Sequence, residues 1–266
     1  MLRGASAEAL RELTGSLGSS GTLEDQAQLG QDLFGVVRVL RGDAALRRAL
    51  TDNSVEGDSK AGLANAVFAS AVVDKAASLV ADAASRRWTS SADLATVLEQ
   101  LAVVTTVRSA GAKGKQVGDE LFGVRRLVDG NPDLRSALAD PARTTADRGT
   151  LLTGLLSGKV EAATETLVSE AVTRDGSIAS ALDSYLELAA QALEETVVTV
   201  HTARELSAAD QQRLADALSK QYATTVQLHV VLDPGLIGGL RVEIGDDVID
   251  GAVASRLDDA RRKVAG

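Results

Sequence analysis

The chain has 266 residues, of which 45% are hydrophobic and 24% are charged, and its formal net charge is −9. Phosphate binding needs clustered Lys and Arg, so this acidic balance argues against a nucleic-acid partner. The absence of cysteine excludes disulfides, thiolate metal sites and cysteine nucleophiles.

The low aromatic content predicts a helical protein. Aromatic residues make up 2% of the chain and there are 3 prolines, so the core must be filled by Ala, Leu and Val, which suits closely packed helices. No run approaches the roughly 20 apolar residues that span a bilayer, and the first residues lack the apolar stretch of a signal peptide. We therefore expect a cytoplasmic protein that reaches a membrane only through a partner.

The first strong helical pattern follows Thr22, which together with Asp25 is suited to cap a helix N-terminus. The helix it starts has an apolar stripe that ends at Gly42 and contains Leu29, Leu33, Val36, Val37 and Leu40. Four shorter helices are expected next. The first carries Leu46 and Leu50, and the second carries Leu63, Val67 and Phe68. The third carries Val73, Leu79 and Val80, and the fourth carries Leu94, Val97, Leu98, Leu101 and Val104. Helices this short are unstable alone, so their stripes must pack on one another.

An internal repeat divides the helical region. The tetrapeptide Leu-Phe-Gly-Val at residues 33–36 recurs at residues 121–124, and further identities follow at nearly constant spacing. This spacing is far longer than the units of solenoid proteins, so it predicts a duplicated bundle with copies at residues 1–112 and 113–194. Gly111 to Gly118 is the expected connection, and Phe34 and Phe122 should occupy equivalent buried places.

The last part of the chain changes its period. From residue 195 the pattern alternates with β-branched residues, which predicts a small α+β domain over residues 195–266. Its expected order is a strand, a helix capped by Ser207, a strand at 225–232, a turn, a strand through 240–244, a short strand at 248–249 and a final helix through Leu257. The predicted fold class is therefore mainly α, a duplicated helical bundle followed by this domain.

No pattern of catalytic, cofactor-binding or metal-binding residues rises above chance. The glycines from Gly235 to Gly239 are not followed by the Gly-Lys-Ser/Thr of a phosphate loop. The acids near Asp246 lack the spacing of a calcium loop, and His201 and His229 have no partner ligands nearby. Trp88 is expected to pack at a helix end. The sequence thus predicts a non-enzymatic protein without a cofactor or metal.

The C-terminal region carries a specific motif. Residues 233–239 read Asp-Pro-Gly-Leu-Ile-Gly-Gly, residues 248–251 read Val-Ile-Asp-Gly, and residues 255–257 read Ser-Arg-Leu. This combination resembles the C-terminal signature of the delta subunit of bacterial F-type ATP synthases, the oligomycin-sensitivity-conferring protein family, in an enlarged form with a doubled bundle. The signature residues, expected to be structural, are Asp233, Pro234, Leu236, Ile237, Gly238, Gly239, Asp250, Gly251, Arg256 and Leu257.

The resemblance implies a non-catalytic stator subunit that resists rotational torque. In the family, the helical bundle binds N-terminal segments of the alpha subunits of the catalytic head, and the C-terminal domain binds the C-terminal end of the b subunit of the peripheral stalk. The implied location is the cytoplasmic face of the plasma membrane, as a peripheral part of the complex. The duplication leaves open which bundle copy contacts the head, and a helical adaptor unrelated to ATP synthase is the alternative.

Overall fold

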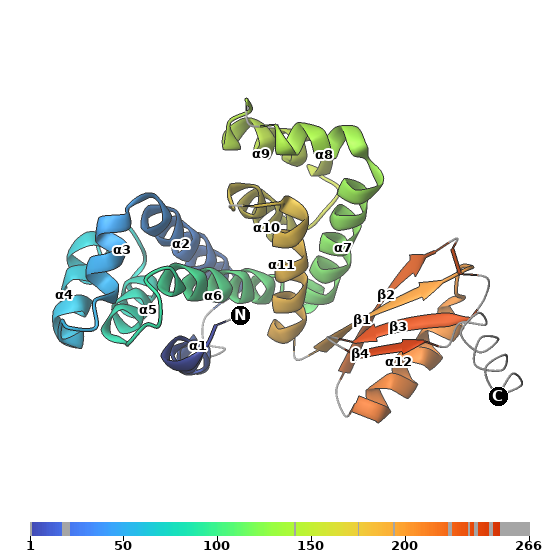
Figure 1. Cartoon of the computed structure of the whole chain (residues 1–266), viewed down its shortest axis with the longest axis horizontal. Coiled ribbons are helices and arrows are strands. Elements are labelled where there is room, and N and C mark those ends of the chain that lie inside the picture. The colour runs from blue at the N-terminus through green and yellow to red at the C-terminus, as the bar shows by residue number, and fades with distance from the viewer. Residues whose placement is uncertain are drawn as a thin grey trace, which may run out of the picture. The chain divides into compact units, whose positions relative to one another are not determined.

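The computed structural model describes residues 2–17, 22–140, 142–174, 176–193, 195–222, 225–233, 235–236, 239–244 and 247–250. The chain divides into two compact units, residues 1–189 and residues 190–266, which we describe separately (Figure 1). The mainly α fold class with a small α+β C-terminal part is confirmed. None of the helices in the described ranges is both long and apolar enough to cross a bilayer. The predicted final helix through Leu257 lies outside the described residues.

Twelve α-helices are present in the described residues. Helix α1 (Gly4–Leu17) is followed by what we call the first helix set: α2 (Leu23–Gly42), α3 (Ala44–Thr51), α4 (Gly57–Phe68), α5 (Asp74–Ser85) and α6 (Asp93–Ser109). A 3₁₀ turn, η1 (Gly111–Lys113), leads to the second helix set: α7 (Gly114–Gly130), α8 (Pro132–Ala139), α9 (Thr145–Leu156), α10 (Ala162–Thr173) and α11 (Ile178–Ala192). Helix α12 (Ala208–Tyr222) belongs to the C-terminal unit.

The bounds of three helices in each set recur at one interval. Helices α3, α4 and α5 have 8, 12 and 12 residues, as do α8, α9 and α10. The members of each pair start 88 residues apart, at 44 and 132, 57 and 145, and 74 and 162. Helix α6 starts 89 residues after α1, close to this interval. The boundary predicted between the copies, after residue 112, stays a prediction.

The residues at the helix ends form the caps that their chemistry predicts. Thr22 and Asp25 form a reciprocal capping box at the start of α2, and Pro132 occupies the first turn of α8, where its missing N–H costs nothing. The connection between the two sets is shorter than the predicted Gly111 to Gly118. It contains η1, and α7 follows at once, with Gly114 and Gly118 buried in it, where small residues allow close packing.

Two predicted burial patterns need correction. Leu63 and Val67 lie on the outer side of α4, 38% exposed each, because Ala64 and Phe68 form its buried face. Phe34 is buried but Phe122 is only partly buried, so the two are not equivalent. The ring of Phe34 lies 6.5 Å from that of Tyr185 in α11, so the second helix set helps to cover it.

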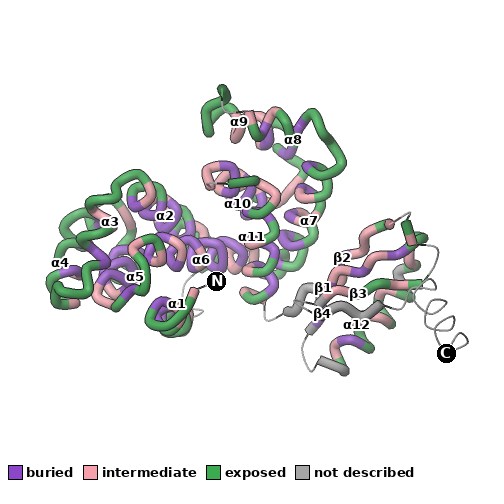
Figure 2. Tube along the Cα trace, in the orientation of Figure 1, coloured by how far each residue is buried: buried purple, intermediate pink, exposed green. Residues whose placement is uncertain are grey.

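Helix α6 has no polar face. All residues from Leu94 to Val107 except Thr96 and Gln100 are buried, and Figure 2 shows the helix buried along most of its length. It packs against α1, α2, α3 and α5 of the first part of the chain and against α7 and α10 of the second helix set. A helix that is apolar all round is one that neighbours surround. Helix α6 is therefore part of the cores of both helix sets.

The C-terminal unit is built on a four-stranded sheet in the order β2-β1-β3-β4. The strands are β1 (Glu195–Thr202), β2 (Thr225–Leu232), β3 (Leu240–Ile244) and β4 (Asp247–Asp250), close to the predicted positions. Strands β1 and β2 run parallel with α12 between them in sequence, and the other pairs are antiparallel. The core consists of Val198, Val200, Val226 and Val242 from the sheet and Leu218 from α12.

We predict that Leu101→Ala in α6 destabilises the whole helical unit. Leu101 is 0% exposed, and truncating such a residue costs about 2–5 kcal/mol. Leu127, 41% exposed on α7, provides the matched control, because Leu127→Ala should change stability by less than about 0.5 kcal/mol. Urea unfolding followed by circular dichroism measures both. Equal effects of the two variants would show that α6 is not a core element.

Candidate functional site

A groove lies where the end of α1 and the starts of α2 and α5 meet; we call it the first-set groove. Its main hollow has a volume of about 590 Å³ and a smaller one of about 210 Å³ adjoins it, since both are lined by Ser16, Leu17 and Lys75. The buried side chains of Leu17 and Leu29 give the groove an apolar floor, and Val73 is 39% exposed on its wall. Apolar grooves with charged rims suit an amphipathic partner helix.

The charged rim includes Asp25, Asp74 and Lys75. Hydrogen bonds from Thr22, chiefly from its backbone N–H at 2.8 Å, hold the pKa of Asp25 below its ordinary value. The Asp25 carboxylate therefore stays charged at neutral pH. The start of α5 is fixed to α2 because the Val73 N–H donates to the Asp32 carboxylate at 2.7 Å.

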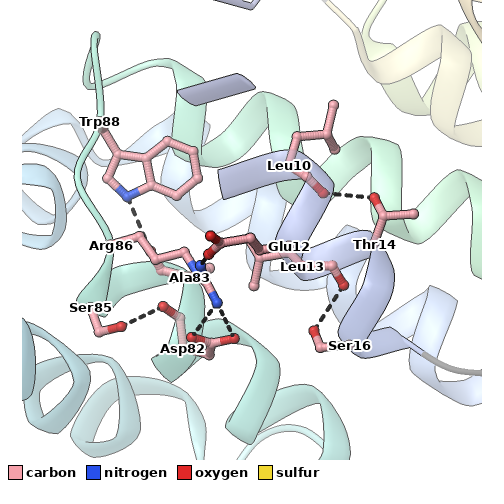
Figure 3. A network of polar contacts seen from close by, with 10 residues as sticks. All are labelled: Leu10, Glu12, Leu13, Thr14, Ser16, Asp82, Ala83, Ser85, Arg86 and Trp88. Carbon is pink, nitrogen blue, oxygen red and sulfur yellow. Dashed lines mark hydrogen bonds and ion pairs between the residues drawn. The ribbon is translucent and has the colours of Figure 1, made fainter. Parts of the chain in front are cut away.

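A polar network holds α1 against α5 beside this groove (Figure 3). Arg86, directly after α5, forms ion pairs with Glu12 of α1 and with Asp82, the latter at 3.0 Å. Trp88 is 3% exposed, and its indole N–H donates to the Ala83 carbonyl at 3.0 Å, so its predicted packing role is confirmed. These contacts keep α1 in place as one wall of the groove.

In the second helix set, an ion pair and a hydrogen bond cross the place that corresponds to the first-set groove. Eighty-eight residues after Asp25 and Val73 stand Lys113 and Glu161, which form an ion pair at 2.8 Å. Gln116 also donates to Glu161 at 3.2 Å. This ion pair raises the pKa of Lys113, which therefore stays charged. The rim that is open in the first set is bridged in the second.

The two helix sets are joined around one buried carboxylate. The side chain of Glu99 in α6 is 4% exposed; it pairs with Arg41 of α2 at 2.7 Å and accepts a hydrogen bond from the Tyr185 hydroxyl of α11 at 2.8 Å. Arg174, after α10, lies 3.5 Å from the same carboxylate and 5.9 Å from the centre of the Tyr185 ring. A buried charge is tolerated only with such partners.

We call Glu99, Arg41, Tyr185 and Arg174 the Glu99 cluster. One of its ion pairs repeats an ion pair of the first set. Arg86 follows α5 and binds Glu12 of α1, and Arg174 stands 88 residues later, follows α10 and binds Glu99 of α6. Helix α6 thus has the same place in the second set that α1 has in the first. Sequence reasoning missed Glu99, and the signal for it was a lone acid among the apolar residues of α6. The acid that matches it in the repeat, Glu187, is exposed on α11.

The signature residues that the structure describes lie in a turn and at the ends of strands. The Asp233 carboxylate accepts a hydrogen bond from the Gly235 N–H at 2.8 Å, and the Leu236 N–H donates to the Asp233 carbonyl at 3.1 Å, which makes a turn after β2. Gly239 has a φ of 87°, which favours glycine, just before β3, and Asp250 ends β4. Pro234, Ile237, Gly238, Gly251, Arg256 and Leu257 lie outside the described residues.

Ligand chemistry is sparse in the C-terminal unit. His201 lies 3.6 Å from Glu243, which also pairs with Arg241 at 2.9 Å. Within the described ranges, no group of three or more His, Cys, Asp or Glu side chains is placed to hold a metal ion. The features that remain are the groove and the Glu99 cluster, both of which suit protein contacts.

We predict that Tyr185→Phe destabilises the protein by roughly 1–3 kcal/mol at about pH 8, since a buried carboxylate loses a donor. Burial and the neighbouring Glu99 raise the pKa of Tyr185 above its ordinary value of about 10. The unfolded chain then loses this proton first, so the stabilisation is complete below about pH 10 and declines above it. Urea unfolding at about pH 8 and about pH 10.5 should show a smaller difference between variant and wild type at the higher pH. A difference that grows with pH would contradict the assignment.

Comparison with known proteins agrees with the resemblance seen in the sequence. The sequence profile described as ATP synthase delta (OSCP) subunit matches residues 101–264, from within α6 to the C-terminal unit. The chain is 46% identical to the ATP synthase subunit delta of a Nocardioides species, with 100% of this chain and 98% of the relative covered. The protein of the same name from Streptomyces coelicolor is 40% identical over 99% of this chain and 98% of its own length.

A third relative, from Thermobifida fusca, is 37% identical, with 97% of this chain and 96% of the relative covered. These alignments include the first helix set, which precedes the region that the profile matches. The enlarged form is therefore shared by these proteins. On this evidence the chain belongs to the ATP synthase delta (OSCP) subunit family.

Proposed function

We propose that this chain links the catalytic head of an F-type ATP synthase to the b subunit of its peripheral stalk. Delta subunits are structural and non-catalytic components of ATP synthase, and family membership over nearly the whole chain carries the proposal. A helical adaptor unrelated to ATP synthase is not favoured. The two compact units support the linking role, since each can hold a different partner. The proposed location is the cytoplasmic face of the plasma membrane, peripheral to the bilayer.

The proposed contact with the head is an N-terminal segment of an alpha subunit in the first-set groove. The apolar floor formed by Leu17 and Leu29 can receive the apolar side of an amphipathic helix, and the charged rim lies beside its polar side. The second set offers less room for such a segment, because the bridge between Lys113 and Glu161 spans the matching place.

The proposed contact with the b subunit is the C-terminal unit. The signature that distinguishes the family begins at Asp233 and lies wholly in this unit. The unit has its own sheet and its own core around Val198 and Val200, so it can present a surface independently of the helices.

We also propose that the two helix sets arose by duplication. Besides the helix bounds, a hydrogen bond recurs at the same interval: the Val73 N–H donates to Asp32 at 2.7 Å, and the Glu161 N–H donates to Glu120 at 2.9 Å. Because α6 takes the place of α1 in the second set, the copies share one helix. This sharing accounts for six helices in α1–α6 and only five more in α7–α11.

The groove contact predicts that Val73→Asp weakens binding of a labelled peptide from the alpha-subunit N-terminus by about tenfold or more, since a charge on the apolar wall must be desolvated. Val73 is 39% exposed, so the fold should tolerate the change. Val39→Asp, at a position 45% exposed near the opposite end of α2, is the matched control and should bind normally. Fluorescence anisotropy measures both affinities. Unchanged binding by Val73→Asp would place the segment elsewhere.

The stalk contact predicts that a fragment starting at residue 190 binds a peptide from the C-terminal end of the b subunit. A unit of this size has only a marginal core, so the peptide should also raise the melting temperature of the fragment. The same peptide is titrated into residues 1–189 as the control. If it binds the helical unit and ignores the fragment, the two ends of the link are assigned the wrong way round.

A further inference from the structure

Three arginines from both helix sets surround a second hollow at their junction. This arginine hollow has a volume of about 360 Å³ and is lined by Arg41, Arg47, Ala92, Ala95, Thr96 and Arg174. Arg41 and Arg174 are 28% and 27% exposed, so their guanidinium groups can be reached from solvent. Such a concentration of positive charge stands out in a chain with a net charge of −9.

The three arginines have more N–H donors than there are acceptor atoms bonded to them in the described residues. Each guanidinium offers five N–H groups. Arg41 and Arg174 share the carboxylate of Glu99, which is the one acid in the described residues within ion-pair distance of any of the three. Arg47 donates to the carbonyl of Leu40 at 2.7 Å, while its buried Nε has no hydrogen-bond partner in the described part of the chain.

The start of α6 adds to the positive field of the hollow. Ala92 is the N-cap residue of α6 and provides no side-chain acceptor, and Ala95 and Thr96 belong to the first turn. The unpaired N–H groups of a first helical turn favour an anion. The acid of this turn, Asp93, accepts hydrogen bonds from the Ser6 hydroxyl at 2.6 Å and the Ser90 N–H at 3.2 Å.

The hollow is not a by-product of the repeat. Eighty-eight residues after Arg41 stands Asp129, which pairs with Arg125, so an acid stands at the place that matches one of the three arginines. These donors meet where α2, α3, α6 and the segment after α10 converge.

We infer that the arginine hollow binds a small oxyanion of the size of inorganic phosphate. Guanidinium groups bind phosphate oxygens in pairs, and three of them with a helix N-terminus can satisfy several oxygens at once. Because the arginines come from both helix sets, the bound anion would tie the sets together beside Glu99. This inference is independent of the proposed contacts with the head and the stalk.

The test uses the full chain and inorganic phosphate, with chloride at equal ionic strength as the reference. Calorimetry should show saturable binding of phosphate, and phosphate should raise the melting temperature. Thr96→Glu places a carboxylate in the hollow and should weaken phosphate binding by about tenfold or more, because like charges repel. Thr96→Gln introduces a side chain of the same shape as Glu but without the charge, and this variant should still bind phosphate. ATP serves as the comparison ligand, and any ATP binding is expected to be the same in Thr96→Glu and in wild type.

Arg47→Gln provides a second variant, which should also lose the phosphate response while keeping the helical circular dichroism spectrum. The inference is overturned if phosphate does no more than chloride, or if Thr96→Glu binds phosphate as tightly as Thr96→Gln. ATP binding that Thr96→Glu abolishes would overturn the assignment to a free monophosphate-sized anion.

Discussion

The burial of α6 by both helix sets is the constraint on which the helical unit depends. Helices of the first set and of the second set pack on it, so nearly every residue from Leu94 to Val107 is removed from water. Burial of this kind is the main favourable contribution to folding. The one carboxylate within that span, Glu99, needs Arg41, Arg174 and Tyr185 as partners, and these partners hold α2, α10 and α11 to the same helix.

The shared helix also determines where a partner segment can bind. In the first set, α1 forms one wall of an open groove and is held by Arg86 through Glu12. In the second set, α6 stands in the place of α1, and the bridge between Lys113 and Glu161 spans the rim. The family profile begins inside α6, so it includes the second half of the helix that both sets use. A stator must transmit load, and two helix sets around one common helix give a continuous core for that purpose.

Local chemistry made much of this structure predictable. The capping box at Thr22, the proline at the start of α8 and the strand at 225–232 follow from short-range rules about donors, φ angles and side-chain alternation. The C-terminal signature identified the family because its glycines and turn residues depend on backbone geometry, as the φ of Gly239 illustrates. These features need no knowledge of which elements pack together.

The features that sequence reasoning missed are set by tertiary contacts. Periodicity shows that Leu63 and Val67 lie on one side of α4, but it cannot tell which side the neighbours cover. Phe34 and Phe122 match in sequence, but Phe34 is buried beside Tyr185 and Phe122 is only partly buried. The groove and the Glu99 cluster likewise join residues far apart in the chain. The repeat indicated a duplicated bundle, but it gave no sign that α6 would contribute to the cores of both helix sets.

The most direct test of the shared helix uses the single tryptophan of the chain, Trp88, which is buried next to α5 in the first set. Leu167→Ala removes a fully buried side chain from α10 in the second set. Urea unfolding is followed by Trp88 fluorescence in wild type and variant. If one core joins the two sets, they unfold together, and the Trp88 transition moves to lower urea with an unchanged slope. A Trp88 transition that stays at the wild-type midpoint would show two independent bundles and contradict the account.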